Sequence, residues 1–532
     1  MPETLQDCKA LFLELAGKAP DWQPPALMPE NVQDSKESET DDESPNKTEG
    51  ERGSTRLIKM LSHCTLYHDD SGVAYILINK RLEPLDVRNK RLSSYLCYAY
   101  HKMTGKAPGR EAISSTIQVL EGKALHEGAC IELFNRIGEK DKSFHYDLLK
   151  GRCVSISSGK WEITETPPVF FRHFNHQQAH PDPVPGGDPW QFFEYCNLPE
   201  ESRLLVMVAV IACFIPRIPH PVLHITGPQG SGKSSFCRLL KSLIDPSAAA
   251  LLSLPRKEED MDLLLYRHHL VTLDNMSDLS ASLSDRLCGV ITGSTIEKRQ
   301  LFTDTDTALL RCNPVIVLNG ITPLIHRPDL LDRSITITLE RITPEERREE
   351  GELWQRFEEA LPSMLGGIFD TLAKAMEIYP TVKLKSLPRL ADACRYGFAI
   401  SEALGVRGNE FIQAYAENAN LQTEELIDSN LLFSSLLAYM ENHEELTGTF
   451  KEVLEKLTET AQPGKNDKSF PSTPRGLRSH IERIRVPLGD VGIIYQHKGK
   501  TSRGKIVEFK KRKCKADSTE DLLFTEDELS ES

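Results

Sequence analysis

The stretch GPQGSGKSS, residues 227–235, decides how the middle of this 532-residue chain folds. The apolar run HPVLHIT precedes it and the amphipathic run FCRLLKSLI follows it. Glycines permit backbone conformations that other residues avoid, so successive N–H groups can turn toward one point at the positive end of the next helix. The pattern G-x-x-x-x-G-K-[ST] between a strand and a helix therefore predicts a phosphate-binding loop.

Each part of this loop has an expected role in holding a nucleotide. Lys233 is expected to reach the β- and γ-phosphates, and Ser234 to ligate Mg²⁺. A purely structural turn is the alternative interpretation. The predicted nucleotide-binding residues of the loop are Gly227, Pro228, Gln229, Gly230, Ser231, Gly232, Lys233, Ser234 and Ser235.

Two later apolar runs end in polar residues that suit phosphate chemistry. HLVTLD ends at Asp274, the expected second ligand of Mg²⁺. PVIVLN ends at Asn319, which is expected to orient an attacking water or, alternatively, to form an Asn-Gly turn. Asn275 stands where many ATPases carry a glutamate that polarises water, so the sequence indicates binding more directly than hydrolysis. Asp278 is a candidate for the missing base.

The apolar runs between residues 191 and 345 alternate with helical ones, which is typical of an α/β fold with a parallel sheet covered by helices. From 346 to 445 the periodicity is helical throughout, and we expect a helical lid. The predicted strands are VLHIT, ALLSL, HLVTLD, PVIVLN and SITITL.

The rest of the chain divides by composition. Residues 1–28 are expected to hold a short docking helix or a frayed terminus, 29–56 an acidic disordered linker, and 57–190 a small α/β or winged-helix-like domain. Residues 446–513 show two helical runs followed by two strand runs around the basic loop HKGKTSRG, which predicts a winged helix. Residues 514–532 form an acidic tail.

Histidines and cysteines give weaker indications of function than the glycine loop does. His173, His176 and His180 are close in sequence. They are interpreted either as metal ligands or as ordinary histidines. The twelve cysteines are scattered singly, which favours reduced thiols and a cytoplasmic protein. The longest apolar run, residues 204–215, is too short to cross a membrane.

Charge is distributed unevenly. The net charge is −14, yet residues 464–515 hold 15 Lys and Arg against 4 Asp and Glu. Such a basic module inside an acidic chain favours a nucleic-acid partner over a merely solvated surface. The expected DNA contacts are Arg475, Arg478, Arg483 and Arg485 on the second helix and Lys498, Lys500, Arg503 and Lys505 on the wing.

Taken together, these motifs resemble those of the AAA+ P-loop ATPases, in particular the superfamily III helicases and the primase-helicase type ATP-binding proteins of phages and mobile elements. The residues that carry the resemblance are GPQGSGKS, LDN, ITG, RQLFTDTD, PVIVLNGI, RPDLLDR and PRLADACRYG. The resemblance covers roughly residues 60 to 510. It implies a Mg²⁺-dependent ATPase that assembles as a homo-oligomeric ring on DNA and meets a replication partner protein.

The resemblance also implies roles for residues outside the loop. Arg333 or Arg327, just before the fifth predicted strand, would reach the γ-phosphate of a neighbouring subunit, and a solvated salt bridge is the alternative. Arg389 would sense nucleotide from the lid. Lys298 and Arg299, in GSTIEKRQLFTDTD, would lie on a hairpin in the central pore and contact single-stranded DNA; an exposed loop with incidental charges is the alternative.

Three functions remain open at this point. The first is a helicase-like DNA motor that acts in the replication of a phage or mobile element. The second is an ATP-controlled switch that binds DNA, in element regulation or phage defence, without unwinding it. The third and least favoured is a primase, for which Asp69 and Asp70 in YHDDSG are the nearest candidate acids, although such acids commonly form a turn.

Overall fold

The structure is a computed structural model of the chain. It describes residues 53–293, 296–299, 307–310, 313–320, 324–343, 345, 347–384, 388–462, 470–501 and 504–511. Within these ranges, the side chains of 296–299, 307–310, 423–429, 483, 486, 487, 490, 500, 501 and 504 are not described. The predicted helix within 1–28, residues 29–52 of the predicted linker and the tail 514–532 lie outside the described residues.

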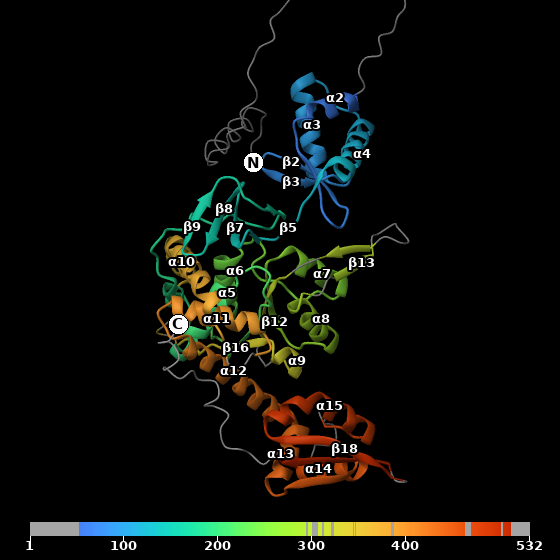
Figure 1. The fold of residues 1–532 in the computed structure, drawn as a ribbon, viewed down its shortest axis with the longest axis vertical. Coiled ribbons are helices and arrows are strands. Elements are labelled where there is room, and N and C mark those ends of the chain that lie inside the picture. The colour runs from blue at the N-terminus through green and yellow to red at the C-terminus, as the bar shows by residue number, and fades with distance from the viewer. Residues whose placement is uncertain are drawn as a thin grey trace, which may run out of the picture. The chain divides into compact units, whose positions relative to one another are not determined.

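The central sheet consists of four parallel strands (Figure 1). They are β11 (Val222–Thr226), β12 (Leu270–Met276), β15 (Val315–Gly320) and β16 (Ser334–Thr338), in the order β12–β15–β11–β16. Every residue of β11 and β15 is buried, which is typical of parallel strands covered on both faces. The α/β class with a parallel sheet is confirmed.

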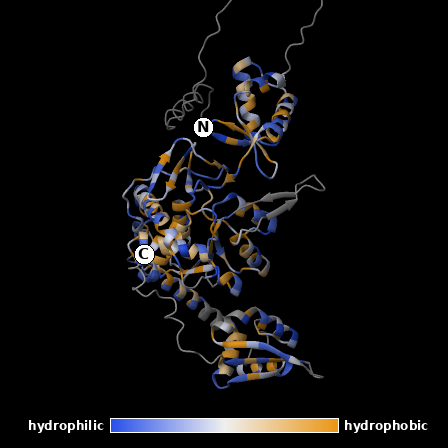
Figure 2. Ribbon diagram, in the orientation of Figure 1, coloured by the Kyte–Doolittle hydropathy of each residue, from blue (hydrophilic) through white to orange (hydrophobic). Residues whose placement is uncertain are grey.

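Helices cover both faces of this sheet because successive side chains of a strand point to opposite sides. Leu223 belongs to the hydrophobic cluster formed with α5 (Glu200–Ala212), α6 (Lys233–Ile244), α10 (Glu350–Ile378) and α11 (Ala391–Ala403). Its neighbour Val222 belongs to a second cluster, formed with α7 (Glu258–Arg267), α8 (Ala281–Ile291) and α9 (Pro328–Leu331). Figure 2 shows these strands and the inner helix faces in the hydrophobic colour.

One predicted strand is absent from the sheet. The run ALLSL pairs with β12 only at Leu252, through the hydrogen bonds from Leu252 N to Thr272 O and from Asp274 N to Leu252 O, both 2.9 Å. Leu254 is 39% exposed, and Pro255 has no N–H with which to extend the pairing. The prediction of a strand here was therefore wrong.

The sheet β6–β7–β8–β9 shares the core of the central sheet. Its strands are β6 (Ile137–Lys140), β7 (Ser143–Leu149), β8 (Arg152–Ser157) and β9 (Lys160–Thr164), all antiparallel to their neighbours. Tyr146 packs on Phe214 and Phe369, with ring centroids 5.2 and 5.7 Å apart. The predicted boundary at residue 190 therefore does not separate two hydrophobic cores.

Residues before this sheet form a smaller unit with its own core. Helices α2 (Gly53–Met60), α3 (Lys90–Thr104) and α4 (Arg110–Glu127) pack with the sheet β3 (Arg81–Pro84), β2 (Ala74–Ile78), β1 (Leu66–His68) and β4 (Ala129–Cys130). The short strands β5 (Leu133–Phe134) and β10 (Phe170–Phe171) pair in parallel. Because α2 begins at Gly53, the last residues of the predicted disordered linker are helical.

The C-terminal unit contains the two helices and two strands that the sequence predicts, plus one further helix and one further strand. The predicted elements are α14 (Phe450–Ala461), α15 (Pro474–Asp490), β18 (Ile493–Thr501) and β19 (Gly504–Lys511). The additional strand β17 (Glu445–Thr449) pairs with β19. Helix α13 (Leu431–Glu441) contributes Leu432, Phe433 and Leu436 to the core of this unit. The predicted lid therefore ends with α12 (Gly408–Ser429), not at residue 445.

Long helices are present in the helical region, and α10 alone has 29 residues. Over the described part of the chain, no helix combines the length and apolar character that crossing a membrane requires.

Candidate functional site

The loop between β11 and α6 is built on left-handed glycines. Gly227, Gly230 and Gly232 have φ values of 137°, 83° and 79°. A Cβ at Gly227 would collide with the carbonyl oxygen of Leu339, so a larger residue cannot replace it without backbone movement. Gly232 is the N-cap residue of α6 and has no side chain to cap the helix, which leaves the first N–H groups of α6 for another acceptor.

Lys233 lies across this loop. Its Nζ donates hydrogen bonds to the carbonyl oxygens of Gly227, at 2.7 Å, and Pro228, at 2.9 Å. Partial burial lowers the pKa of Lys233 from its ordinary value, while the carboxylate of Asp274 opposes that effect. The ammonium group is thus held over the loop by weak neutral acceptors that an anion can replace.

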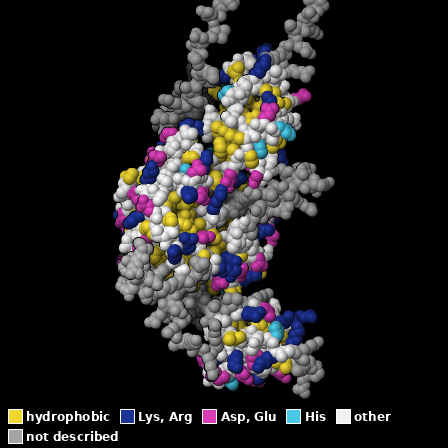
Figure 3. Space-filling model, in the orientation of Figure 1, with side chains coloured by type: hydrophobic (Ala, Val, Ile, Leu, Met, Phe, Trp, Pro, Cys, Tyr) yellow, Lys and Arg dark blue, Asp and Glu magenta, His cyan; other side chains and the backbone are white. Residues whose placement is uncertain are grey.

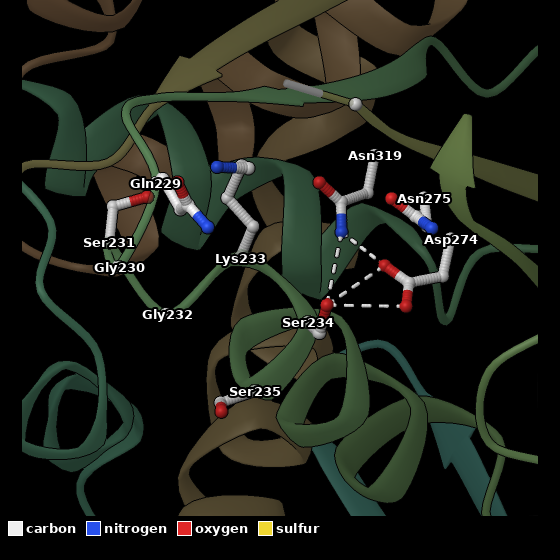
Figure 4. Close-up of a pocket in the computed structure, with 11 residues that line it drawn as sticks. Gln229, Gly230, Ser231, Gly232, Lys233, Ser234, Ser235, Asp274, Asn275 and Asn319 are labelled. Carbon is white, nitrogen blue, oxygen red and sulfur yellow. Dashed lines mark hydrogen bonds between the residues drawn. The ribbon is translucent and has the colours of Figure 1, made fainter. Parts of the chain in front are cut away.

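Three polar side chains converge beside the loop, as Figure 4 shows. Ser234 Oγ donates to the two carboxylate oxygens of Asp274, at 3.0 and 3.2 Å. Asn319 Nδ2 donates to Asp274 Oδ1. The convergence follows from the sheet, because Ile225 pairs with Asn319 and Leu273 with Leu318, which brings the carboxyl ends of β11, β15 and β12 to one edge.

These residues surround a pocket of about 440 Å³, called here the phosphate-loop pocket. Asp274 is the one carboxylate among its described lining residues, and Asp278, the candidate base, does not line it. The lining consists of Gln229, Gly230, Ser231, Gly232, Lys233, Ser234, Ser235, Asp274, Asn275, Asn319 and Gly320.

Two buried polar atoms at this pocket have no hydrogen-bond partner among the described residues. They are Ser231 Oγ and Asn319 Oδ1, in side chains that are 1% and 3% exposed. An unpaired buried polar atom costs free energy, so both atoms favour a polar ligand or water at this position.

A second pocket of about 500 Å³, called here the adjoining pocket, shares Ser231, Gly232 and Ser235 with the first. Its other walls come from residues 193–197 at the end of the 3₁₀ helix η1 (Pro189–Tyr195), from Phe236 and from residues between 339 and 353, and they include Tyr195, Ile342 and Leu353. Sequence reasoning missed these residues, and the aromatic run WQFFEY, residues 190–195, is the signal that could have indicated them.

Comparison with known proteins assigns the chain to a family. Residues 191–418 match the model of the actinomycete integrative conjugative element replication protein, and residues 432–520 match the C-terminal domain of the same protein. The two matches together span more than half of the chain. The chain belongs to this replication protein family. No curated protein sequence is significantly similar to it.

Solved structures resemble this replication protein only distantly. The C-terminal region of NrS-1 in an apo form is 13% identical, with a TM-score of 0.40 and coverage of 86% of this chain and 98% of that one. JCV helicase is 14% identical, with a TM-score of 0.23 and coverage of 41% and 65%. Likenesses at this level do not establish a shared fold.

Of the three candidate arginines of the replication protein, Arg333 lies at the opposite edge of the sheet. Arg333 precedes β16, and its carbonyl accepts a hydrogen bond from Val222 N at the start of β11, five residues from the phosphate loop. Five strand residues span about 16 Å. Arg333 pairs with Asp329 at 2.7 Å, and Arg327 with Asp285 at 2.6 Å.

Arg389 joins the same ion-pair group. It donates to Asp332 at 3.1 Å and to Asp329, and it does not line the phosphate-loop pocket. The structure therefore does not support Arg389 as a nucleotide sensor within its own chain, because it lies at the amino edge of the sheet while the loop lies at the carboxyl edge.

The candidate DNA contacts are described only in part. Lys298 and Arg299 belong to β13 (Ile296–Arg299), which pairs antiparallel with β14 (Thr307–Leu310), but their side chains are outside the described residues. The same holds for the side chains of Arg483 and Lys500 and for the whole of Arg503.

Of the other basic residues in the C-terminal unit, Arg475, Arg478 and Lys505 are exposed. Arg485 lies 3.7 Å from Glu482, and Lys498 pairs with the buried Glu508. Figure 3 shows Lys and Arg side chains of this unit interspersed with acidic ones on the visible face.

The three sequence-adjacent histidines do not share a ligand site. His173 pairs with Asp147 at 3.0 Å, His176 stacks on His268, and His180 bonds the carbonyl of Ser242. No group of three or more His, Cys, Asp or Glu residues in the described ranges is arranged to hold a metal ion.

The adjacent acids Asp69 and Asp70 lie in the turn between β1 and β2. The Asp69 carboxylate accepts hydrogen bonds from Ser71 N, Val73 N and the Tyr75 hydroxyl, all at 3.0 Å. These bonds stabilise the turn and occupy the carboxylate, which disfavours the primase hypothesis.

Proposed function

We propose that this replication protein binds ATP with Mg²⁺ in the phosphate-loop pocket and uses ATP hydrolysis to drive a helicase-like DNA motor in the replication of its mobile element. The observation that carries the proposal is the convergence of Lys233, Ser234, Asp274 and Asn319 beside a glycine loop at the amino end of α6. This set offers N–H donors and a cation to phosphates, and oxygen ligands to a hard cation.

The residues fit a Mg²⁺–triphosphate complex. Ser234 Oγ and the Asp274 carboxylate lie 3.0 Å apart, and both are the oxygen ligands that Mg²⁺ accepts alongside phosphate oxygens and water. When bound, Mg²⁺ would neutralise charge on the β- and γ-phosphates. Lys233 would exchange its bonds to Gly227 and Pro228 for phosphate oxygens, and Ser231 Oγ would gain a partner.

The adjoining pocket is suited to the nucleobase. It borders the same loop at Ser231 and Gly232, and it combines the aromatic Tyr195 with the apolar Ile342 and Leu353. The same pocket also carries the charged side chains of Glu194, Arg347, Arg348 and Glu350, so the apolar members would pack on the faces of a planar base while polar groups fix its orientation. The two pockets together would therefore hold both ends of one nucleotide.

Asn319 would position the attacking water. Its Nδ2 is already engaged by Asp274, so its free Oδ1, which is buried and unpaired among the described residues, is the atom left to accept a hydrogen bond from that water. An amide does not remove the proton, so Asn319 would orient the water and not act as base.

Transition-state charge would be neutralised from a second subunit. Within one chain, Lys233 is the one cation among the described residues that line the phosphate-loop pocket. Arg333 lies at the far edge of the sheet, so in a homo-oligomeric ring it would face the nucleotide of the neighbour, with Arg327 as the alternative. The basic C-terminal unit would hold duplex DNA as a winged helix, and the β13–β14 hairpin would meet a single strand.

A second candidate function is an ATP-controlled switch that assembles on DNA without unwinding it. The observation that favours it is the absence of any glutamate among the described residues lining the pocket, together with the exposed Asn275 beside Asp274. Slow hydrolysis would then set how long the protein stays bound to DNA, instead of driving translocation.

The test compares the wild-type protein with Lys233→Ala and with the control Lys123→Ala, an exposed lysine on α4. Calorimetry should show ATP binding for wild type and control and at least a tenfold loss for Lys233→Ala, because the phosphate contact is charge-assisted. Strand displacement that requires ATP and Lys233 supports the motor. DNA-stimulated turnover without displacement supports the switch, and no ATP binding by the wild type contradicts both.

A further inference from the structure

A groove of about 560 Å³ lies at the amino edge of the central sheet, apart from the phosphate-loop and adjoining pockets. Its floor comes from the residues that precede three strands, among them His220 before β11, His269 before β12 and Pro314 before β15. We call it the amino-edge groove. The phosphate loop lies at the other end of β11.

Two arginines give this groove its charge. The guanidinium of Arg172 lies over the ring of Tyr266, 5.2 Å from its centroid, and that of Arg217 over Phe134, at 5.6 Å. Arg172 Nη1 also donates to the carbonyl oxygen of Leu133 at 2.9 Å, and Arg172 Nε is buried with no hydrogen-bond partner among the described residues, which favours a polar ligand or water beside this guanidinium. Among the described residues of the lining, Glu132 is the one carboxylate; it pairs with Arg217 at 2.5 Å, and both side chains are more than half exposed.

The histidines of the groove add no charge at neutral pH. Burial lowers the pKa of His220 to about 3 and that of His268 also to about 3. Ile215, Ile218 and Pro314 add apolar walls. The groove therefore suits a ligand that is anionic and also carries flat or apolar parts, which describes a nucleotide strand better than an acidic peptide.

The groove is tied to the root of the β13–β14 hairpin. Thr292 and Gly293, before the hairpin, and Asn313, after it, all line the groove. Asn313 Nδ2 donates to the carbonyl of Ile218 at 2.9 Å, one residue from Arg217. The groove is lined by the end of α7 and by the residues just before β13, two elements that are labelled in Figure 1.

Arg217 is held in an unusual backbone conformation. Its φ is 59°, in the left-handed region that arginine rarely occupies. Such conformations persist where the surroundings impose them, and they are concentrated at functional positions. Pro216 and Pro219 restrict the loop on both sides of Arg217.

We propose that the amino-edge groove is a binding site for single-stranded DNA, in which Arg172 and Arg217 contact the phosphates and stack on bases at the root of the hairpin. This inference rests on the proposed DNA motor, because it places a strand beside the hairpin. It adds a site on a different edge of the sheet, formed by residues that no DNA-binding motif in the sequence indicates.

The test measures binding of a fluorescein-labelled oligothymidylate to the full chain by anisotropy, over a series of salt concentrations. The variants are Arg172→Ala, Arg217→Ala and the double substitution. Arg152→Ala is the matched control, because it also removes an arginine from a partly exposed ion pair, with Asp182 at 2.8 Å, outside the groove. A labelled duplex of the same length is measured in parallel.

We expect the double variant to bind the single strand at least tenfold more weakly, with the salt slope reduced by about 0.7 for each lost phosphate contact. Duplex binding should stay within twofold, because the duplex is expected at the C-terminal unit. Glu132→Gln should tighten single-strand binding about two- to threefold, since it removes the competing carboxylate. A gain of this kind does not arise from damaged folding.

Three results would overturn the inference. The first is an unchanged affinity of the double variant for the single strand, and the second is an equal loss of affinity for single strand and duplex. The third applies if the arginine variants fail to fold: Glu132→Gln then binds the single strand no more tightly than wild type. If the wild type binds no single-stranded DNA with or without ATP, the proposed motor fails as well. If the wild type binds it and the double variant binds it equally, only the groove is excluded.

Discussion

At the scale of single residues, the backbone conformation of Asn275 explains why a glutamate does not follow Asp274 in this chain. It follows Asp274 at an irregularity of β12, where the pairing with β15 shifts between Leu273 and Met276. Its φ is 55°, a left-handed conformation that Asn tolerates better than other non-glycine residues. The left-handed backbone at Asn275 directs Asp274 toward Ser234 and returns Met276 to the core. The backbone therefore disfavours a glutamate at position 275.

Replacing Asn275 should follow that backbone preference. Asn275→Gly should leave the free energy of unfolding within about 0.5 kcal/mol of wild type, whereas Asn275→Glu should lower it by about 1 kcal/mol, because a longer side chain is strained at positive φ. Urea denaturation measures both, with Asn175→Glu as control at an exposed residue without positive φ. A fully stable Asn275→Glu with faster ATP turnover would contradict this account.

At the scale of secondary-structure elements, α6 and β12 are joined at both ends. At one end Ser234 bonds Asp274. At the other, the Asp245 carboxylate accepts hydrogen bonds from the backbone N–H groups of His269 and Leu270, both at 3.1 Å, and from Lys241 Nζ at 2.7 Å. Asp245 therefore sets the position of α6 along β12, and with it the spacing of the candidate Mg²⁺ ligands.

Arg136, from the loop before β6, completes this buried cluster. Its Nε donates to Asp245 at 2.9 Å, and both side chains are fully buried. Burial alone would raise the pKa of Asp245, but the adjacent Lys241 and Arg136 outweigh that effect and hold it well below its ordinary value. The remaining N–H groups of Arg136 bond the carbonyls of Asp147, Gln178 and Pro246.

Arg136→Met should lower the free energy of unfolding by about 3–5 kcal/mol, because it removes one partner of a buried ion pair and three hydrogen bonds to carbonyl oxygens. Arg152→Met, at a partly exposed pair with Asp182, should cost no more than about 1 kcal/mol. Thermal unfolding of the full chain compares the two variants. Equal losses of stability in the two variants would show that the buried cluster around Asp245 is not a main connection between the sheet β6–β9 and the core.

At the scale of the whole molecule, buried neutral histidines make the fold sensitive to acid. Burial is the main cause that lowers their pKa values below the ordinary 6.5: to about 3 for His180, His220 and His268 and to about 4 for His224. Nearby cations reinforce the effect, such as Arg136 beside His180 and Lys241 beside His268.

Since the folded pKa values lie below the unfolded value, the unfolded chain binds more protons than the folded chain as the pH falls below 6.5. Stability should be constant above that pH and should decrease below it, by up to about 1.4 kcal/mol per pH unit for each histidine. Urea denaturation between pH 7.5 and 5.5 measures the slope. His180→Gln should reduce it, while His126→Gln, at an exposed position, should not. An equal slope in all three proteins would exclude this cause.

The sequence by itself determined the class of the core and most of its strands. Apolar runs that end at Thr226, Asp274 and Asn319 are buried strands of one parallel sheet, because continuous hydrophobicity over five to seven residues suits a strand covered on both faces. The glycine-lysine motif also predicted a turn followed by a helix from local chemistry alone, and the structure contains both.

Only the tertiary structure decided which elements share a core and which edge of the sheet each side chain occupies. No pattern in the sequence indicates that Tyr146 packs on Phe369, more than 200 residues away. Likewise, the motifs RPDLLDR and PRLADA predict arginines that contact nucleotide. Strand order and direction place Arg333 and Arg389 far from the phosphate loop of their own chain. Local patterns determine which faces avoid water, whereas the choice of partner depends on packing between segments distant in sequence.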